Sequence, residues 1–226
     1  MKIVKPSVKL LWITPEPEKQ IEIAGRTCYK SEDKITTNSA FKFCKKLRES
    51  GHHAMLEHAS ASFRIITDRG ITHEIVRHRL ASYAQESTRY CNYGSGRFDG
   101  ECTFIEPPLL AGEDHEIFVE EYGYPASQKE IWIRSCEEAE EKYLLLIKAG
   151  CSPQIARSVL PNCLKTEIVM TANLREWMHF IKLRSVITAH PQIRPIAKRI
   201  NGVLHTYVPS LFDFMEPDFF LTRDKK

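Results

Sequence analysis

One stretch of the chain gathers most of the side chains that could bind an anion. It runs from Arg77 to Tyr90 and reads RHRLASYAQESTRY, with three arginines, a histidine, an amide and several hydroxyls. Guanidinium groups and hydroxyls together suit a phosphate, because bidentate charge-assisted hydrogen bonds hold an oxyanion in place. On a helix, Glu74, Arg77 and His78 would share one face. The alternative is a solvated basic turn, and these residues alone leave both interpretations open.

A second candidate group follows in the segment from Asn173 to Arg184. At about 100° per residue, a helix here would have one broad apolar face and a polar face opposite. The apolar face comprises Leu174, Trp177, Met178, Phe180 and Ile181, and the polar face comprises Arg175, His179 and Lys182. Arg184 falls within the apolar stripe, where an unpaired guanidinium costs several kcal/mol. Arg184 should therefore have a partner, unless it lies past the helix end and reaches water.

The elements that must position these groups can be predicted from periodicity and from turn residues. We expect strands at Val8–Thr14, Ala59–Thr67 and Lys165–Thr171, an extended segment at Ser87–Tyr93 and a loop at Tyr93–Pro108. We expect helices at Glu18–Lys30, Thr37–Ser50, Ile71–Leu80, Gln128–Ala149, Asn173–Arg184 and Ile193–Tyr207, and one that opens at Ser152-Pro153 and ends at Pro161. These strands and helices lack a regular βαβ rhythm. The fold class predicted is α+β, with a mostly antiparallel sheet, a single domain over residues 1–226 and no Rossmann fold.

Composition restricts the class of protein. The 226 residues are 42% hydrophobic and 27% charged, which is ordinary for a globular protein. The net charge of +3 is too small to predict a nucleic-acid partner. No apolar run reaches membrane-spanning length and no signal peptide is visible, so we expect a cytoplasmic protein without a membrane partner. The seven cysteines include no C-x-x-C pair and are interpreted as reduced, packed thiols.

Two segments resemble familiar sequence signatures but do not match them. The glycine cluster from Gly94 to Gly100 is one residue too long for a dinucleotide fingerprint and does not open a helix. His73 and His78 bracket a glutamate as in zinc proteases, but they are five residues apart and would diverge on a helix. We therefore expect no metal site.

The anion-binding stretch carries a more specific pattern. Arg77, His78 and Arg79, separated from Ser87 by seven residues, resemble the signature of flavin-dependent thymidylate synthases. Four further segments resemble that family in the same order along the chain. They are Ala24-Gly25-Arg26 with Cys28; Gly51-His52 with Glu57-His58; Ala156-Arg157 with Val159-Leu160-Pro161; and Asn173-Leu174-Arg175 with Phe180 and Leu183-Arg184.

The resemblance implies an activity and a set of ligands. Such an enzyme is a methyltransferase of dTMP biosynthesis that converts dUMP to dTMP by reductive methylation. The carbon comes from 5,10-methylenetetrahydrofolate, and NADPH provides the hydride through bound FAD. The resemblance also implies a homotetramer whose active sites are shared between subunits.

The resemblance also assigns roles to residues. Arg184 is implied as the catalytic arginine that holds the uracil ring and favours its N3-deprotonated form. The implied dUMP-binding residues are Glu74, Arg77, Gln85, Glu86, Ser87, Thr88, Arg89, Arg157 and Arg184. The implied FAD-binding residues are His52, Arg77, His78, Arg79, Gln85, Asn173, Arg175 and His179. Folate-binding residues are not assigned, although His52 is implied to lie on the flavin and folate side.

The chain departs from the family pattern at several positions. Ala84 and Gln85 stand where several members carry Asn and Glu, Ala54 and Cys28 replace a frequent threonine and serine, and Thr188 replaces a histidine. Ser87 ranks as a phosphate ligand rather than a nucleophile, because spacing identifies no general base for it. The competing class is a non-catalytic nucleotide-binding or nucleic-acid-binding protein that uses the same arginines.

Overall fold

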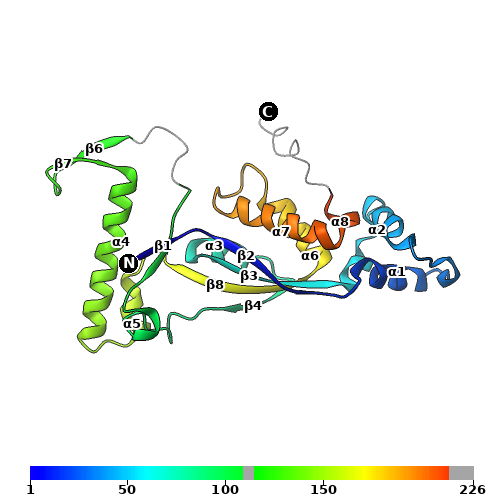
Figure 1. Ribbon diagram of the computed structural model, residues 1–226, viewed down its shortest axis with the longest axis horizontal. Helices are drawn as coiled ribbons and strands as arrows, with labels where there is room; N and C mark the ends of the chain where they lie inside the picture. The colour runs from blue at the N-terminus through cyan, green and yellow to red at the C-terminus, as the bar shows by residue number, and fades with distance from the viewer. Residues whose placement is uncertain (109–114, 214–226) are drawn as a thin grey trace. The chain divides into compact units, whose positions relative to one another are not determined.

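Four strands that lie far apart in sequence form the main sheet of the computed structural model, which describes residues 1–108 and 115–213 (Figure 1). The strand order is β2-β3-β8-β4, with β2 at Ser7–Ile13, β3 at Ser60–Asp68, β8 at Lys165–Asn173 and β4 at Ala81–Gln85. Two small sheets accompany it. β1 (Lys2–Val4) pairs in parallel with β5 (Thr103–Ile105), and β6 (Glu116–Val119) pairs antiparallel with β7 (Tyr124–Ser127). The predicted α+β class is confirmed.

The residues pack as two compact units. The first comprises Met1–Pro6, Ile66–His73 and Gln85–Glu167, and the second comprises Ser7–Ile65, Glu74–Ala84 and the chain from Ile168 onward. β3, β4 and β8 each contribute residues to both units. The single domain over residues 1–226 therefore stays a prediction.

Helices make up much of the second unit. They are α1 (Pro17–Thr27), α2 (Ser39–Glu49), α6 (Leu174–Arg184), α7 (Ile193–Tyr207) and α8 (Pro209–Phe212), with short 3₁₀ turns at Glu32–Lys34 and His53–His58. Figure 1 shows α6 and α7 on the same side of the sheet. α6 is held on β3 by Trp177, whose ring meets Phe63 edge-on at 5.0 Å and whose Nε1 donates to the Ala61 carbonyl at 3.0 Å. This packing sets the direction in which α6 presents its last residue, Arg184.

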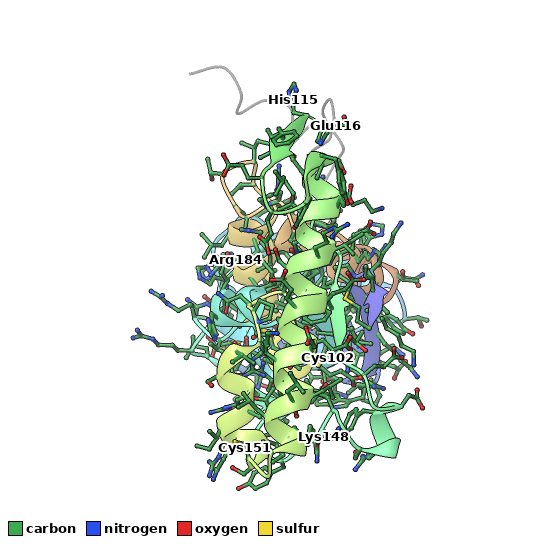
Figure 2. The ribbon with its side chains drawn as sticks, turned by 90° about the vertical axis from the view of Figure 1, so that its left-hand side faces the viewer. Cys102, His115, Glu116, Lys148, Cys151 and Arg184 are labelled. Carbon is green, nitrogen blue, oxygen red and sulfur yellow. The ribbon has the colours of Figure 1, made fainter. Side chains whose placement is uncertain are left out.

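The first unit is built on α4 (Gln128–Lys148), drawn with its side chains in Figure 2. Ser127 caps the helix by accepting a hydrogen bond from the Glu130 backbone, and Gly150 follows its end with a φ of 92°. The core beside α4 contains Tyr93, Phe104, Tyr143 and other buried side chains. α5 (Pro153–Ala156) and a 3₁₀ turn at Arg157–Val159 follow, so the predicted start at Ser152-Pro153 is confirmed.

Most predicted elements are confirmed to within a few residues. The three strands, the long helix α4, the helix α6 with its Asn173 cap and the helix α7 all form where the sequence indicated them. The apolar face of α6 is buried and its polar face is exposed, as the rotation predicted. No helix in the described ranges is long and apolar enough to cross a membrane.

Two predicted elements are wrong. The helix predicted at Ile71–Leu80 is α3, which spans Arg69–Ile75 and ends before Arg77. The predicted extended segment at Ser87–Tyr93 is a turn, in which the Ser87 carbonyl accepts from the backbone of Tyr90 and Cys91. β4 precedes that turn and was not predicted. β5, within the predicted loop at Tyr93–Pro108, and its partner β1 were also missed.

Candidate active site

The structure gives Arg184 three partners. Its Nη1 lies 2.7 Å from Glu74 Oε2, its Nη2 donates to the Glu74 carbonyl at 2.9 Å, and its Nε donates to His78 Nε2 at 3.1 Å. The side chain is 16% exposed. The prediction that Arg184 has a partner is confirmed, because Glu74 and His78 both accept its hydrogen bonds. The alternative, a solvated arginine past the helix end, is excluded because Arg184 is the last residue of α6.

His78 is neutral in this arrangement. Its side chain is buried, and burial together with the charge of Arg184 lowers the pKa of His78 to about 4. Because Arg184 donates to Nε2, the single ring proton must lie on Nδ1, which donates to Glu176 Oε1 at 3.1 Å. Burial also raises the pKa of Glu176. The guanidinium of Arg184 is thus fixed on two sides by a hydrogen-bonded series that runs Glu176–His78–Arg184–Glu74.

The shortened α3 explains how these partners meet. A continued helix would require the Glu74 and Ile75 carbonyls to accept backbone hydrogen bonds four residues on. The Glu74 and Ile75 carbonyls instead accept from the backbone only three residues on, at Arg77 and His78. Arg184 also donates to the Glu74 carbonyl, and the Tyr83 hydroxyl lies 2.9 Å from the Ile75 carbonyl and 2.6 Å from the His78 carbonyl. Side-chain donors from β4 and α6 thus contact the carbonyls that a continued helix would use. The prediction that Glu74, Arg77 and His78 share one helical face is wrong, because α3 ends at Ile75.

The Arg77–Arg79 segment presents two positive charges to solvent. Both guanidinium groups are exposed, and neither has a hydrogen-bond or ion-pair partner within residues 1–108 and 115–213. His78 between them points inward. Exposed, uncompensated arginines are suited to an anion such as a pyrophosphate.

The first unit contains a separate group around the turn after β4. Arg157 Nη1 donates to the hydroxyl of the buried Thr88 at 2.8 Å, and the Arg89 backbone donates to Ser87 Oγ at 3.3 Å. The Arg89 guanidinium is exposed and lies 5.4 Å from the centre of the Tyr90 ring. Ser87, Thr88 and Arg89 thus lie in the turn after β4, and Arg157 lies in the 3₁₀ turn at Arg157–Val159. These are residues that the family resemblance assigns to the phosphate.

The Glu86 carboxylate faces the protein and not the solvent side of this turn. Tyr93 donates to Oε1 at 2.8 Å, and Lys165 donates to Oε2 at 2.8 Å and to Glu167 at 2.9 Å. Burial alone lowers the pKa of Lys165, but these carboxylates outweigh burial and raise it. Burial and the Glu86 carboxylate raise the pKa of Tyr93, so its hydroxyl remains a donor. The Glu86 backbone N–H also donates to the Glu167 carbonyl at 2.9 Å, so both its carboxylate and its N–H are engaged within the first unit.

Gln85 is likewise engaged inside the first unit. Its Nε2 donates to the hydroxyls of Thr72 at 3.0 Å and Thr166 at 3.2 Å. Sequence reasoning missed Lys165, Tyr93 and these threonines, because a partner on another strand leaves no signal in the local pattern.

The remaining predicted residues lie in the second unit. Asn173 caps α6 by accepting from the Glu176 backbone at 2.9 Å, and Arg175 pairs with Glu57 at 2.6 Å. His179 is exposed, with its ring 5.4 Å from that of His78. Glu57 and Glu176 were not predicted as partners. The Asn-x-x-Glu spacing is typical of a helix N-terminus and was the signal available for Glu176.

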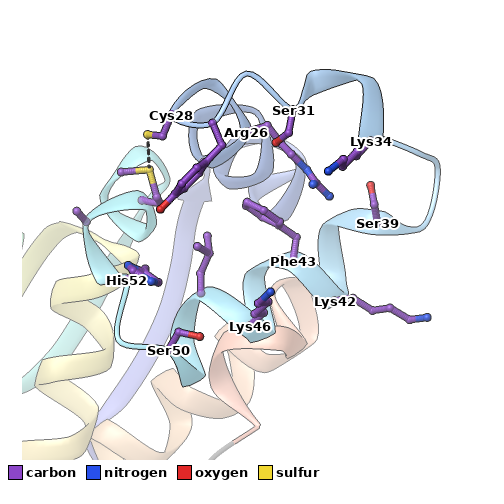
Figure 3. Close-up of a pocket in the computed structure, with 15 residues that line it drawn as sticks. Arg26, Cys28, Ser31, Lys34, Ser39, Lys42, Phe43, Lys46, Ser50 and His52 are labelled. Atoms are coloured by element: carbon purple, nitrogen blue, oxygen red, sulfur yellow. Dashed lines mark hydrogen bonds between the residues drawn. The ribbon is translucent and has the colours of Figure 1, made fainter.

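A cavity of about 1010 Å³ lies beside α1 and α2 in the same unit (Figure 3). His52 lines it, together with Cys28 and Ala54, two of the positions at which the chain departs from the family pattern. The exposed His52 is therefore placed at a site large enough for a ligand.

One group of possible metal ligands occurs in the described part of the chain. His78, Glu176 and His179 each offer an atom within 4.8 Å of the others. Arg184 already donates to the His78 Nε2, so a cation bound to that nitrogen would displace a fixed positive charge. The expectation of no metal stays a prediction.

Comparison with known proteins agrees with this geometry. Residues 9–210 match the model of the family described as thymidylate synthase complementing protein. A flavin-dependent thymidylate synthase of Geobacter sulfurreducens is 31% identical over 212 residues, covering 91% of this chain and 84% of the relative. One of Clostridium tetani is 32% identical over 229 residues, covering 93% and 86%.

A solved structure is also similar. It is the UMP/dUMP methylase PolB from Streptomyces cacaoi, bound with 5-Br dUMP, with a TM-score of 0.75 and 25% sequence identity. The match covers 94% of this chain and 96% of that one. The extent of these matches means that the chain belongs to the family of flavin-dependent thymidylate synthases.

Proposed function

We propose that this enzyme methylates dUMP to dTMP, with 5,10-methylenetetrahydrofolate as the carbon donor and NADPH as the source of hydride through bound FAD. The observation that carries the proposal is the Arg184 guanidinium, held by Glu74 and by a neutral His78. It is the arginine that the family pattern assigns to the pyrimidine. The name and the bound nucleotide analogue of the similar methylase support the same substrate.

Arg184 has the charge needed to act on a uracil ring. A nearby cation favours the deprotonated form of an acidic group, here the ring N3–H. Because His78 is neutral, Glu74 is the counter-ion that contacts this guanidinium directly. The hydrogen bonds that Arg184 donates to Glu74 and His78 fix the orientation of the guanidinium before substrate binds, which lowers the cost of ordering it.

The turn after β4 is proposed to hold the 5′-phosphate. Arg157, Arg89 and the hydroxyl of Ser87 supply donors, and the clamped Glu86 holds the turn backbone in place. Arginine is suited to this role because its planar fork matches phosphate oxygens. The Thr88 hydroxyl orients Arg157 through the hydrogen bond at 2.8 Å.

The donor groups of the second unit fit an anionic dinucleotide such as FAD. The exposed, unpaired guanidinium groups of Arg77 and Arg79 suit its phosphates, and we assign His52, Asn173, Arg175 and His179 to its remaining parts. When bound, the flavin supplies hydride transfer, which no amino-acid side chain provides. Homotetramerisation with shared sites belongs to the same proposal, and a cytoplasmic location stays a prediction.

An assay of purified protein tests the proposal. We expect a flavin absorption band and dTMP formation from dUMP, methylenetetrahydrofolate and NADPH, measured by release of tritium from labelled dUMP with and without added FAD. A protein that binds dUMP but neither binds flavin nor forms dTMP would instead be a non-catalytic nucleotide-binding protein.

Arg184→Ala tests the role of the guanidinium itself. We expect the variant to keep its flavin band and to lose dTMP formation, because Arg184 acts on the pyrimidine. Arg184→Lys keeps the charge but not the planar fork, and should recover only part of the activity. Turnover at the wild-type rate in the alanine variant would remove Arg184 from the mechanism.

A further inference from the structure

The cavity beside α1 and α2 is strongly basic. Its described lining includes the positive side chains Arg26, Lys34, Lys42 and Lys46 and no carboxylate. Phe43 and Leu47 supply part of its apolar wall. A cavity with this volume, cationic side chains and an apolar wall is suited to an elongated anionic ligand.

The four cations differ in their availability. Arg26 is committed to the protein: its Nε and Nη2 donate to Glu22 at 3.1 and 2.9 Å, and its guanidinium lies 4.4 Å from the Phe43 ring centre. Lys34, Lys42 and Lys46 are exposed and have no hydrogen-bond or ion-pair partner in residues 1–108 and 115–213. The lining therefore offers three free ammonium groups.

Two of the free lysines, Lys42 and Lys46, also repel each other. Lys42 and Lys46 lie four residues apart on α2, a spacing at which like charges destabilise a helix. On the same helix, by contrast, Lys45 and Arg48 are both paired with Asp213. An anion between α1 and α2 would relieve the repulsion that the protein leaves uncompensated at Lys42 and Lys46.

The directions of the side chains suggest an elongated ligand. In Figure 3 the ammonium groups of Lys34 and Lys46 turn toward the space between the helices, whereas Lys42 extends outward. His52 lies on the other side of the opening from Lys34. Because His52 is assigned to the flavin and folate side, a ligand entering there would run toward the lysines.

We propose that this cavity binds the γ-linked glutamate tail of the folate co-substrate, a flexible chain with several carboxylates. The inference rests on the proposed function and adds a subsite to it. Lys34 and Lys46 would pair with carboxylates inside the cavity and Lys42 with one at its mouth.

Carboxylates fit this lining better than the phosphates of a dinucleotide do. Arginine is preferred where a phosphate is held by paired hydrogen bonds, and the arginine in the described lining is already bound to Glu22. Lysines provide separate point charges on flexible stems. Such charges match carboxylates spaced along a flexible tail.

Steady-state kinetics with two forms of the folate tests the subsite. In the wild type, the KM for a pentaglutamylated methylenetetrahydrofolate should be lower than that for the monoglutamate by roughly threefold to thirtyfold, as expected from two or three exposed ion pairs. Added salt should reduce this preference. The double variant Lys34→Gln/Lys46→Gln should lose the preference while keeping the wild-type KM for the monoglutamate and for dUMP.

The matched control is Lys9→Gln/Lys148→Gln, which removes two exposed lysines outside the cavity and should keep the preference. A wild type without any preference, or a preference that survives in the cavity variant, would overturn the proposal. So would a raised KM for NADPH in the cavity variant with the folate preference unchanged, since this would assign the lysines to dinucleotide phosphates.

Calorimetry separates failure of the subsite from failure of the proposed function. Titration of the purified protein with poly-γ-glutamate should show binding that the cavity variant loses and the control variant keeps. This measurement needs no turnover. If the protein forms no dTMP but binds the polymer through these lysines, the proposed reaction is wrong and the anion site is supported. If the wild type does not bind the polymer, the anion site is refuted.

Discussion

At the scale of single residues, burial decides which charges the candidate site contains. His78 sits between two arginines in sequence, yet its ring is enclosed by α6 and meets the Phe180 ring at 4.8 Å. Protonation would place a second cation against Arg184 in a poorly solvated position, so the imidazole stays neutral. The carboxylates of Glu74 and Glu176 and the ring of His179 complete its charged and titratable surroundings.

The lowered pKa of His78 predicts a loss of stability in mild acid. Between about pH 6.5, the ordinary value, and pH 4, the unfolded chain binds a proton that folded His78 does not, so the free energy of unfolding falls as pH decreases. The slope contributed is at most about 1.4 kcal/mol per pH unit. The raised pKa of Glu176 acts in the opposite direction at lower pH, so the useful range is from pH 7 to about pH 5.5.

Urea unfolding at several pH values in this range measures the effect. His78→Gln should flatten the pH dependence relative to the wild type, whereas His205→Gln, at an exposed position, should change it much less. An identical slope in the wild type and His78→Gln would show that the histidine is not buried as a neutral group.

At the scale of elements, two structures near the site depend on side chains from other parts of the chain. α3 ends where Tyr83 and Arg184 take its last carbonyls. The turn after β4 is held because Glu86 is bound by Tyr93 and by Lys165 of β8. These contacts position the residues that the proposed reaction needs, the exposed arginines after α3 and the hydroxyls of Ser87 and Thr88 in the turn.

The clamp on Glu86 predicts a positioning role for Tyr93. Tyr93→Phe keeps the ring in the core but removes the hydroxyl that binds Glu86 Oε1. Losing one hydrogen bond should raise the KM for dUMP roughly threefold to tenfold while kcat stays near the wild-type value, because the phosphate turn loosens and the pyrimidine end is untouched. Tyr207→Phe, far along the chain at an exposed position, is the control. A reduced kcat with an unchanged KM would argue against positioning.

At the scale of the whole molecule, apolar side chains next to site residues remain uncovered in a single chain. Leu80 follows Arg79 and is 71% exposed, and Tyr90 follows Arg89 and is 78% exposed. Single exposed apolar side chains are common at protein surfaces, so a covering partner is expected here from the family resemblance. The homotetramer implied by the family resemblance would provide the cover from copies of this chain.

Light scattering on the purified protein should therefore give four times the chain mass of 26.1 kDa. Leu80→Asp should shift the protein toward smaller species and reduce activity together, because a charge is costly in an interface core. A monomeric wild type with full activity would refute shared sites. The exposed Ile23→Asp on α1 provides a comparison at a position away from the arginine segment.

Local patterns determined much of this protein. The apolar periodicity of α6 placed Arg184 in a buried stripe and required a partner for it. Ser152-Pro153 marked a helix start because proline suits the first helical position, although Ser152 makes no side-chain cap. The arginines and hydroxyls of residues 77–89 left an anion site and a solvated basic turn both open, and the resemblance to a family indicated the site and the reaction. The periodicity and the helix starts depend on residues close together in the chain, so the sequence records them directly, whereas the resemblance rests on segments from Ala24 to Arg184.

The tertiary structure decided the identity of the partners. Glu74 for Arg184 and Lys165 for Glu86 come from elements distant in sequence, whereas Tyr83 lies eight residues after Ile75. The hydrogen bonds of Arg184 and Tyr83 to the carbonyls at the end of α3 override the local helix preference of residues 76–80. β1 and β5 were missed because each is three residues long and depends on pairing with distant segments, β1 with β5 and β5 also with Leu164. Such pairings exist only when the chain is folded, because the hydrogen bonds that stabilise them join atoms that no local pattern brings together.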